Sequence, residues 1–356
     1  MKILLSAAAA AALLLLAGCT TTKNTGKQTH YFFPPPPDAP RLQYLCGFQS
    51  ELEFKGSEDK TFLNYLTGTR PLRRELAKPY GIAVHGKNYY ICDTDFGTII
   101  VLDVQTRKMR LFHAEGEGAL KLPLNVTVDT DGTAYVADTQ RDQVVIFDKD
   151  ENYVAAIGKV NDLKPRDVAV SKDKIYVADL QKHCVRVFDK QTREPLFNIP
   201  RSNEATNAKV EIFTPTNLAL DKEGRLYVGD TGGFHVLVFD ADGKYIRTVG
   251  EFGDGPSQFA RVKGVAVDRE DRLYAVDAMS QVTQIFDANG RLLSWVADPT
   301  ATKATQSLPA KVMVDYDNVG AFQNYIAPGF KAEYLVAVIN QTGPHKLTVY
   351  AFGQKK

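Results

Sequence analysis

The sequence is poor in the motifs that mark common catalytic and cofactor sites. Its 356 residues include four cysteines, one tryptophan and six histidines, with neither a CxxC pair nor the CxxCH motif of covalent haem attachment. The HExxH, GxSxG, P-loop and GxGxxG motifs are also missing, so no familiar hydrolase or nucleotide-binding signature is present. The formal net charge is +1 and Lys and Arg form no stripe, which argues against a nucleic-acid partner.

The small number of cysteines limits the chemistry that thiols can supply. Apart from Cys19 they are Cys46, Cys92 and Cys184, and an odd number leaves at least one thiol free in an oxidising compartment. All three fall in apolar, strand-like segments. We therefore expect them to serve as small buried hydrophobic groups.

One long apolar run is present, at residues 3–17, and it follows a short cationic start. It is too short to span a bilayer comfortably and is typical of a signal peptide. It ends in Leu-Ala-Gly-Cys at 16–19, which resembles the bacterial lipobox. The resemblance implies a lipoprotein signal peptide at 1–18 and a lipidated Cys19 that anchors the chain in a membrane. Because Thr20 is not Asp, we expect the outer membrane of a bacterial cell envelope; the alternative is an ordinary secretory signal with a chance cysteine.

A polar segment separates this anchor from the folded part. Residues 19–40 hold few core-forming side chains and include four consecutive prolines, so we predict a stiff Pro-rich tether. Residues 41–49 read as a strand with no partner nearby in sequence, and 59–68 as a short helix. The folded domain is predicted to span 41–356.

Five repeated hairpins dominate that domain. In each, an apolar strand ends in Asp, and a second apolar strand ends in another Asp ten residues later. The first aspartates are Asp93, Asp138, Asp179, Asp230 and Asp277. A further strand precedes and follows each hairpin, which gives four-stranded antiparallel units at a period of about 45 residues, the pattern of propeller blades. We expect the aspartates to accept turn N–H groups rather than to form a functional site.

A sixth unit lacks one strand. It has strand-like segments at 309–316, 332–340 and 345–352. We predict that residues 41–49 supply its missing strand, which joins the last blade to the first and removes an open sheet edge. The expected fold is an all-β, six-bladed β-propeller closed by its N-terminal strand.

The units over residues 76–352 resemble NHL repeats. They keep the flanks of the family pattern D-x-x-Asn-His-x-V-x-V-F-D, but of the five central Asn-His pairs only His183 survives. The resemblance implies a six-bladed propeller lipoprotein, and it says little about activity because this fold hosts both scaffolds and enzymes. WD40 and kelch propellers fit less well, since the chain has no Trp-Asp pair and no paired glycines in each blade.

One set of positions is predicted to ring a mouth of the central channel. These residues precede the six first strands and are Gly81, Asn125, Asp167, Asn217, Gly264 and Lys311. Asn125, Asp167 and Asn217 offer oxygen ligands suited to Ca²⁺ or Mg²⁺, and propellers of the gluconolactonase type hold a metal with such a mixture. Against a metal, Lys311 is cationic, and Gly, Asn and Asp also tolerate left-handed backbone. We therefore assign no metal, cofactor or catalytic residue, and keep the four polar positions as candidate channel-mouth ligands.

The loops indicate where a partner binds. In a propeller the fourth-to-first and second-to-third connections share one face, and the longest loops of this chain fall there, such as 49–78, 200–213 and 250–261. We expect a non-enzymatic scaffold that binds an envelope or surface protein through this face, for example as an accessory of a redox or secretion complex. The alternatives are a metal-dependent lactonase or lyase acting at the channel mouth, and carbohydrate binding by the loop aromatics Phe96, Phe234, Phe252 and Phe259.

Overall fold

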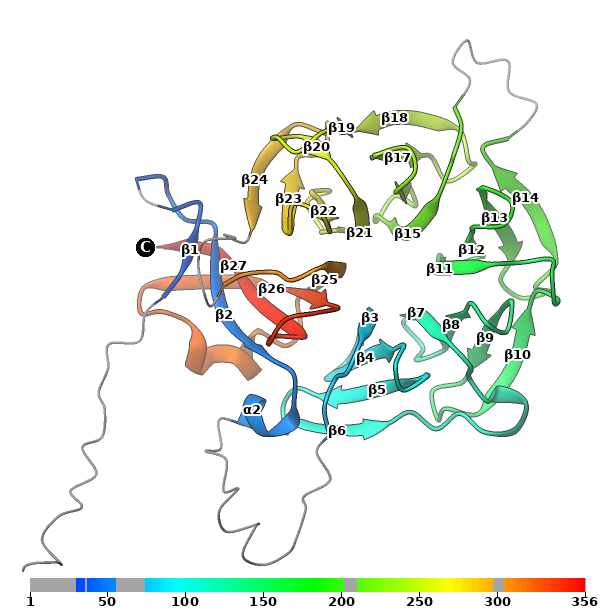
Figure 1. Cartoon of the computed structure of the whole chain (residues 1–356), viewed down its shortest axis with the longest axis horizontal. Helices are drawn as coiled ribbons and strands as arrows, with labels where there is room; N and C mark the ends of the chain where they lie inside the picture. The colour runs from blue at the N-terminus through cyan, green and yellow to red at the C-terminus, as the bar shows by residue number, and fades with distance from the viewer. Residues whose placement is uncertain (1–29, 36, 56–73, 202–209, 297–303, 356) are drawn as a thin grey trace, which may run out of the picture. The chain divides into compact units, whose positions relative to one another are not determined.

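Six sheets surround a common axis, with the first strand of each sheet innermost (Figure 1). The computed structural model describes residues 30–35, 37–55, 74–201, 210–296 and 304–355. The predicted signal peptide, Cys19 and the helix expected at 59–68 lie outside the described residues. Tyr31–Lys356 forms a unit of its own, and this unit is the propeller.

Five blades are each built from four consecutive antiparallel strands. Blade one contains β3 (Pro79–His85), β4 (Asn88–Asp93), β5 (Thr98–Asp103) and β6 (Lys108–Leu111). Blade two contains β7 (Pro123–Val128), β8 (Ala134–Asp138), β9 (Gln143–Phe147) and β10 (Tyr153–Ile157). Blade three contains β11 (Pro165–Val170), β12 (Lys174–Asp179), β13 (Cys184–Asp189) and β14 (Pro195–Ile199). Blade four contains β15 (Pro215–Leu220), β16 (Leu226–Asp230), β17 (His235–Phe239) and β18 (Tyr245–Val249). Blade five contains β21 (Val262–Val267), β22 (Leu273–Asp277), β23 (Val282–Phe286) and β24 (Leu292–Val296).

Blade six is completed by the N-terminal strand, as predicted. Its strands are β25 (Pro309–Asp315), β26 (Phe330–Asn340), β27 (Leu347–Lys355) and β2 (Leu42–Phe48). β2 pairs antiparallel with β27, with Tyr44 opposite Tyr350 and their rings edge to face at 5.9 Å between centroids. The fully buried Gln43 donates to the Tyr325 carbonyl at 2.8 Å and accepts from the Ala327 N–H at 2.9 Å. The ring is therefore closed by two segments that lie about 300 residues apart in sequence, as the pairing of Tyr44 with Tyr350 illustrates.

A fifth strand in blade six was not expected. β1 (Phe32–Phe33) pairs with β2, and Phe33 packs edge to face on Tyr350 at 6.1 Å between ring centroids. The prediction of a tether running to residue 40 missed this strand. Two aromatic residues followed by prolines carry too short an apolar pattern to predict a strand, and only the partner strand makes it one.

Five short elements of the described chain lie outside the blades. They are α2 (Glu51–Lys55), η1 (Gly116–Gly118), η2 (Val319–Tyr325) and the two-residue strands β19 (Glu251–Phe252) and β20 (Gln258–Phe259). Two of them, α2 and η2, pack against the closing strand β2. Phe54 of α2 stacks on Phe48 of β2 at 4.3 Å between centroids and on Phe322 of η2 at 5.5 Å. None of the described helices is both long and apolar enough to cross a membrane.

The core lies between neighbouring blades. Each second strand of blades one to five carries a buried tyrosine three residues before its aspartate: Tyr90, Tyr135, Tyr176, Tyr227 and Tyr274. Cys92 and Cys184 are buried in strands, as expected, whereas Cys46 is half-buried, and none of the three forms a disulfide. Apolar side chains thus fill the spaces between blades, and the polar groups of interest are those at the axis and on the two faces.

Candidate functional site

Every first strand is interrupted by a β-bulge close to its start. The pairing of the first with the second strand shifts register at the same place in all six blades, for example between Pro165 and Asp167 and between Pro309 and Lys311. A bulge bends the strand and redirects a side chain. The six predicted channel-mouth positions all lie at these bulges, inside the first strands rather than just before them.

One ion pair crosses the channel at this level. Lys311 of blade six donates to the carboxylate of Asp167 in blade three, and these two blades face each other across the ring. Asp167 is fully buried and also accepts the N–H groups of Leu218 and Val168, each at 2.9 Å. Burial raises the pKa of Asp167 above its usual value, while the Lys311 ammonium and the two N–H groups counteract the effect of burial. Both carboxylate oxygens therefore already have partners.

Two buried amides complete the polar part of the ring. Asn125 and Asn217 are both fully buried, and Asn125 donates through Nδ2 to the Arg166 carbonyl at 2.8 Å. Its Oδ1, and both polar atoms of Asn217, find no hydrogen-bond partner within the described residues. The channel thus holds one satisfied ion pair beside three amide atoms that lack partners.

Glycine occupies two positions of the ring for a different reason from the one that the sequence suggested. Neither Gly81 nor Gly264 has a positive φ, and neither do the other four ring residues. A Cβ on Gly81 would lie 2.5 Å from Asn125 Oδ1, and one on Gly264 would lie 2.6 Å from the Lys311 Cα. The left-handed backbone explanation is therefore wrong. Glycine is needed because neighbouring first strands approach closely at the axis.

This set of donors does not fit a divalent cation. A Ca²⁺ or Mg²⁺ site needs six or more oxygen ligands around the ion, including waters, and carboxylates supply most of the negative charge. Here the one carboxylate of the ring, Asp167, is neutralised by Lys311. Across the described ranges no cluster of three His, Cys, Asp or Glu side chains is placed to hold a metal.

The repeated aspartates have the structural role predicted for them. Asp138 is fully buried and accepts the N–H groups of Lys121 and Leu122 at 2.6 and 3.0 Å, as well as those of Gln140 and Arg141 in its own turn at 3.2 and 3.1 Å. Asp93, Asp230 and Asp277 bind the equivalent N–H groups of their blades. Each aspartate joins two loops on the same face of its blade. These loops lead into the bulged ends of the first strands, so the aspartates position the channel mouth.

One face of the propeller is formed by the connections from the fourth strand of one blade to the first strand of the next, together with the turns between second and third strands. We call it the loop-bearing face. Five of the large apolar side chains that are exposed in the described chain lie on it: Phe96, Val160, Phe213, Phe252 and Met279. Phe252 is 69% exposed and contacts Phe234 at 4.8 Å between ring centroids, whereas Phe259, which we expected to be exposed, is fully buried. The other exposed large apolar residues lie on the outermost strands: Leu111, Val154, Leu196, Ile246, Leu293 and Trp295.

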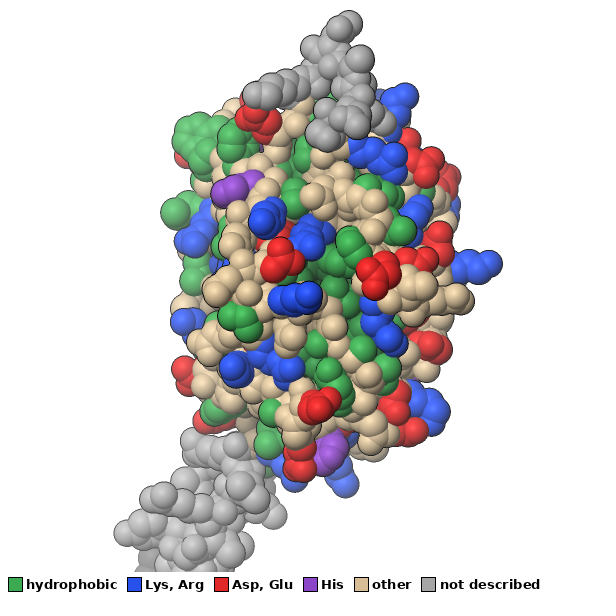
Figure 2. Space-filling model, turned by 90° about the vertical axis from the view of Figure 1, so that its right-hand side faces the viewer, with side chains coloured by type: hydrophobic (Ala, Val, Ile, Leu, Met, Phe, Trp, Pro, Cys, Tyr) green, Lys and Arg blue, Asp and Glu red, His purple; other side chains and the backbone are tan. Residues whose placement is uncertain are grey.

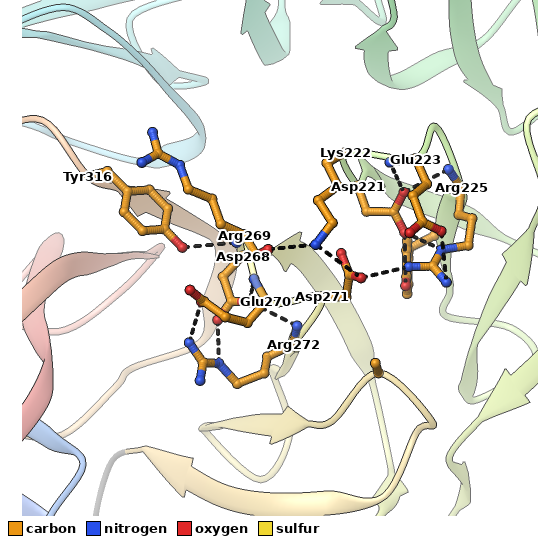
Figure 3. Close-up of polar contacts among 12 residues, drawn as sticks. Asp221, Lys222, Glu223, Arg225, Asp268, Arg269, Glu270, Asp271, Arg272 and Tyr316 are labelled. Atoms are coloured by element: carbon orange, nitrogen blue, oxygen red, sulfur yellow. Dashed lines mark hydrogen bonds and ion pairs between the residues drawn. The ribbon is translucent and has the colours of Figure 1, made fainter.

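On the opposite face, ion pairs and other polar contacts join the turns of neighbouring blades (Figure 3). Arg225 Nη2 lies 3.0 Å from Asp271 Oδ2, and the Lys222 ammonium donates to the Arg269 carbonyl at 3.0 Å. The Arg269 guanidinium lies 3.9 Å from the centre of the Tyr316 ring, whose hydroxyl accepts the Arg269 N–H at 2.9 Å. These contacts connect turns of blades four, five and six. Since the charges are paired with one another, this face offers less to a ligand than the loop-bearing face does.

Comparisons with known protein families support the propeller. Residues 205–303 match a family described as 6-bladed beta-propeller, and residues 163–188 match the NHL repeat. The chain is thus a six-bladed propeller that contains NHL-type repeat sequence. No curated protein sequence matches the chain significantly.

Several solved structures share the fold. A gluconolactonase from Xanthomonas campestris is 16% identical with a TM-score of 0.58, and the alignment covers 91% of this chain and 97% of that one. A protein of unknown function from Bacteroides thetaiotaomicron is 18% identical, with a TM-score of 0.56 and coverage of 78% and 70%. The virginiamycin B lyase of Staphylococcus aureus is 12% identical, with a TM-score of 0.51 and coverage of 78% and 85%. At these identities the similarity establishes the fold alone.

Proposed function

We propose that this chain is a lipid-anchored protein of the bacterial cell envelope that binds another envelope or surface protein through its loop-bearing face. It acts as a rigid scaffold and does not catalyse a reaction. The anchor is Cys19, in the outer membrane, and the part of 19–40 that precedes β1 holds the propeller away from the bilayer.

The distribution of exposed apolar side chains carries this proposal. Phe96, Phe213, Phe252 and Met279 project from different blades on one face, and no large apolar side chain of the described opposite-face turns is exposed to a similar degree. Aromatic residues and Met are enriched in protein interfaces, and Phe252 forms an aromatic pair with Phe234, at 4.8 Å between ring centroids. A protein partner would bury them.

The outer rim also exposes apolar side chains, but they are spread around the ring, one or two on each outermost strand of blades one to five. On the side of the propeller seen in Figure 2, basic and acidic side chains are interspersed and neither sign dominates. Such a surface favours solubility over attraction of one charged polymer. The loop-bearing face is therefore the better candidate for the contact.

Lactonase or lyase activity at the channel mouth is less well supported. A metal-dependent mechanism would need free oxygen ligands where Lys311 binds Asp167. The lactonase and the lyase that share the fold are at most 16% identical to this chain. We therefore assign no reaction to the ring residues.

Position-specific photocross-linking in cells tests the proposal. A benzoylphenylalanine would replace Phe96 or Phe252 on the loop-bearing face, with matched replacements of Lys222 on the opposite face and Leu293 on an outer strand. We expect one discrete cross-linked protein from the first two positions and none from the controls. The same product from all four positions, or none from the loop-bearing face, would contradict the proposed surface. A Cys19→Ser variant that still incorporates labelled palmitate would contradict the anchor.

A further inference from the structure

A second layer of side chains lies directly beside the ring of bulge residues. It consists of the residue that precedes each ring position: Tyr80, Leu124, Arg166, Thr216, Lys263 and Ala310. The long polar side chains come from blades one, three and five, and the other three are apolar or, for Thr216, bound to the Gly229 carbonyl at 3.1 Å. Tyr80, Arg166 and Lys263 are therefore set at alternate blades around the channel.

These three side chains meet over the channel. The Lys263 ammonium lies 5.1 Å from the centre of the Tyr80 ring, although blade six stands between blades five and one. The charge of Arg166 acts on both Tyr80 and Lys263. Side chains from non-adjacent blades can come this close only over the axis. We call Tyr80, Arg166 and Lys263 the mouth cluster.

The mouth cluster carries unbalanced positive charge. Lys263 is 6% exposed, and burial lowers its pKa to about 8, helped by the like charges of Arg261, Arg166 and Lys78. None of these four cations forms an ion pair with a carboxylate in the described part of the chain. The nearby Asp167 cannot compensate for them, because it already binds Lys311.

Two donors in the same place have no acceptor. The Tyr80 hydroxyl and the Arg166 Nε are buried and neither donates to an acceptor among the described residues, while the Arg166 guanidinium approaches the Tyr80 oxygen. Lys263 donates to Gln341 Oε1 at 3.2 Å, which leaves further N–H groups of its ammonium available. A buried donor without an acceptor destabilises a fold, and a buried cation beside like charges does so more strongly. The packing of the blades requires neither these unpaired donors nor this buried cation.

We propose that the mouth cluster binds an oxyanion, a carboxylate or phosphate group that enters the channel from the loop-bearing face. Such a group would accept hydrogen bonds from the Tyr80 hydroxyl, the Arg166 guanidinium and the Lys263 ammonium, and would neutralise their charge. The exposed Lys78 and Arg261 would attract it to the opening. This site goes beyond the proposed scaffold role and does not depend on it, because a small free anion is sufficient to fill it.

Calorimetric titration of the purified chain at pH 7 tests the site. Inorganic phosphate and succinate are titrated separately at constant ionic strength, so that the two sources of the oxyanion are distinguished. Binding of either or both with a dissociation constant below ~10 mM supports the site. If neither binds in that range, the proposal is overturned. The partner cross-linking described above is an independent readout, so either result can fail alone.

Variants locate the binding. We expect Lys263→Gln and Arg166→Gln each to weaken the affinity roughly tenfold or more, the size expected for loss of a charge-assisted hydrogen bond. Lys222→Gln, on the opposite face, is the matched control and should bind like the parent. Urea unfolding confirms that each variant is folded. If the anion binds all three variants with the parental affinity, the binding site lies elsewhere and the proposal is wrong.

The pH dependence provides a further check. The groups that face Lys263 are Tyr80, whose pKa is raised by burial, and the cations Arg166, Arg261 and Lys78. Because the Lys263 pKa is about 8, its ammonium is lost as the pH rises through that value, and the affinity for succinate, whose two carboxylates are already ionised at pH 7, should fall with it. The Lys263→Gln variant should lack this step. An affinity that is flat between pH 7 and pH 9 in the parent would contradict the role of Lys263.

Discussion

Lys311 in blade six and Asp167 in blade three form an ion pair across the central channel, between two strands that face each other in the ring. The contact links residues that lie 144 positions apart in the sequence. It occupies the carboxylate that the sequence had suggested as a metal ligand, and it connects the two halves of the propeller at the axis. Both residues are buried, at 7% exposure for Lys311 and 0% for Asp167.

Loss of either partner of this pair should be costly. We expect Lys311→Met or Asp167→Leu to lower the free energy of unfolding by about 3 to 5 kcal/mol, because each leaves an uncompensated charged group inside the channel. The double variant Asp167→Leu/Lys311→Met should recover much of this loss. Urea unfolding of all four proteins gives the coupling energy, and additive single effects would show that the pair does not act as described.

Closure by the N-terminal strand can be tested by shortening one buried side chain of β2. Leu42 of β2 is fully buried between β1 and β27. Leu42→Ala should lower the free energy of unfolding by about 2 to 5 kcal/mol, the range for removing a buried leucine side chain. Leu293→Ala, on the outer strand of blade five where the residue is 55% exposed, is the matched control and should change little. Equal effects of the two substitutions would argue against a closure that depends on β2.

The two aspartates of a repeat should differ in importance. Asp138→Ala removes a buried carboxylate that accepts four N–H groups from two loops, and we expect a loss of about 3 to 5 kcal/mol in stability. Asp148→Ala removes a partly exposed carboxylate that binds within a single turn, so its effect should be far smaller. Denaturation midpoints of the two variants give the comparison, and a reversed order would contradict the structural account of the repeat.

Lys263 should make the stability of the propeller depend on alkaline pH. Its pKa is about 8 in the folded chain and 10.5 when unperturbed, so between these values the unfolded chain binds more protons and stability rises with pH. At pH 7 we expect Lys263→Gln to be more stable than the parent by about 1 to 2 kcal/mol, after discounting for solvent screening. At pH 10 the difference should largely vanish. If the parent is more stable than the variant at pH 7, burial of the Lys263 ammonium does not destabilise the folded chain.

Much of the fold could be predicted from the sequence because its repeat unit is local. The spacing of Asp138 and Asp148 defines one hairpin, and five copies of that hairpin leave few architectures open. The need to protect a strand edge then made residues 41–49 the candidate for closure, as the pairing of Tyr44 with Tyr350 confirms. β1 could not be predicted because its two residues become a strand only through β2.

The channel could be predicted only in part. The alignment of first strands brought Asp167 and Lys311 to the same ring, but it could not show that they bind each other across it. Tyr80, Arg166 and Lys263 occupy equivalent repeat positions, and this register was the available signal for the mouth cluster. Their charge and burial depend on which side chains of non-adjacent blades reach the axis, and that is a property of the closed ring.

The central claim is that the loop-bearing face binds a protein, and the affinity of the cross-linked partner tests it most directly. The purified partner would be titrated against the parent, against Phe96→Ser/Phe252→Ser and against the outer-strand control Leu293→Ser. We predict that the double variant binds at least about tenfold more weakly, since aromatic anchors dominate such interfaces, and that the control binds like the parent. Parental affinity in Phe96→Ser/Phe252→Ser, or an equal loss in Leu293→Ser, would contradict the claim.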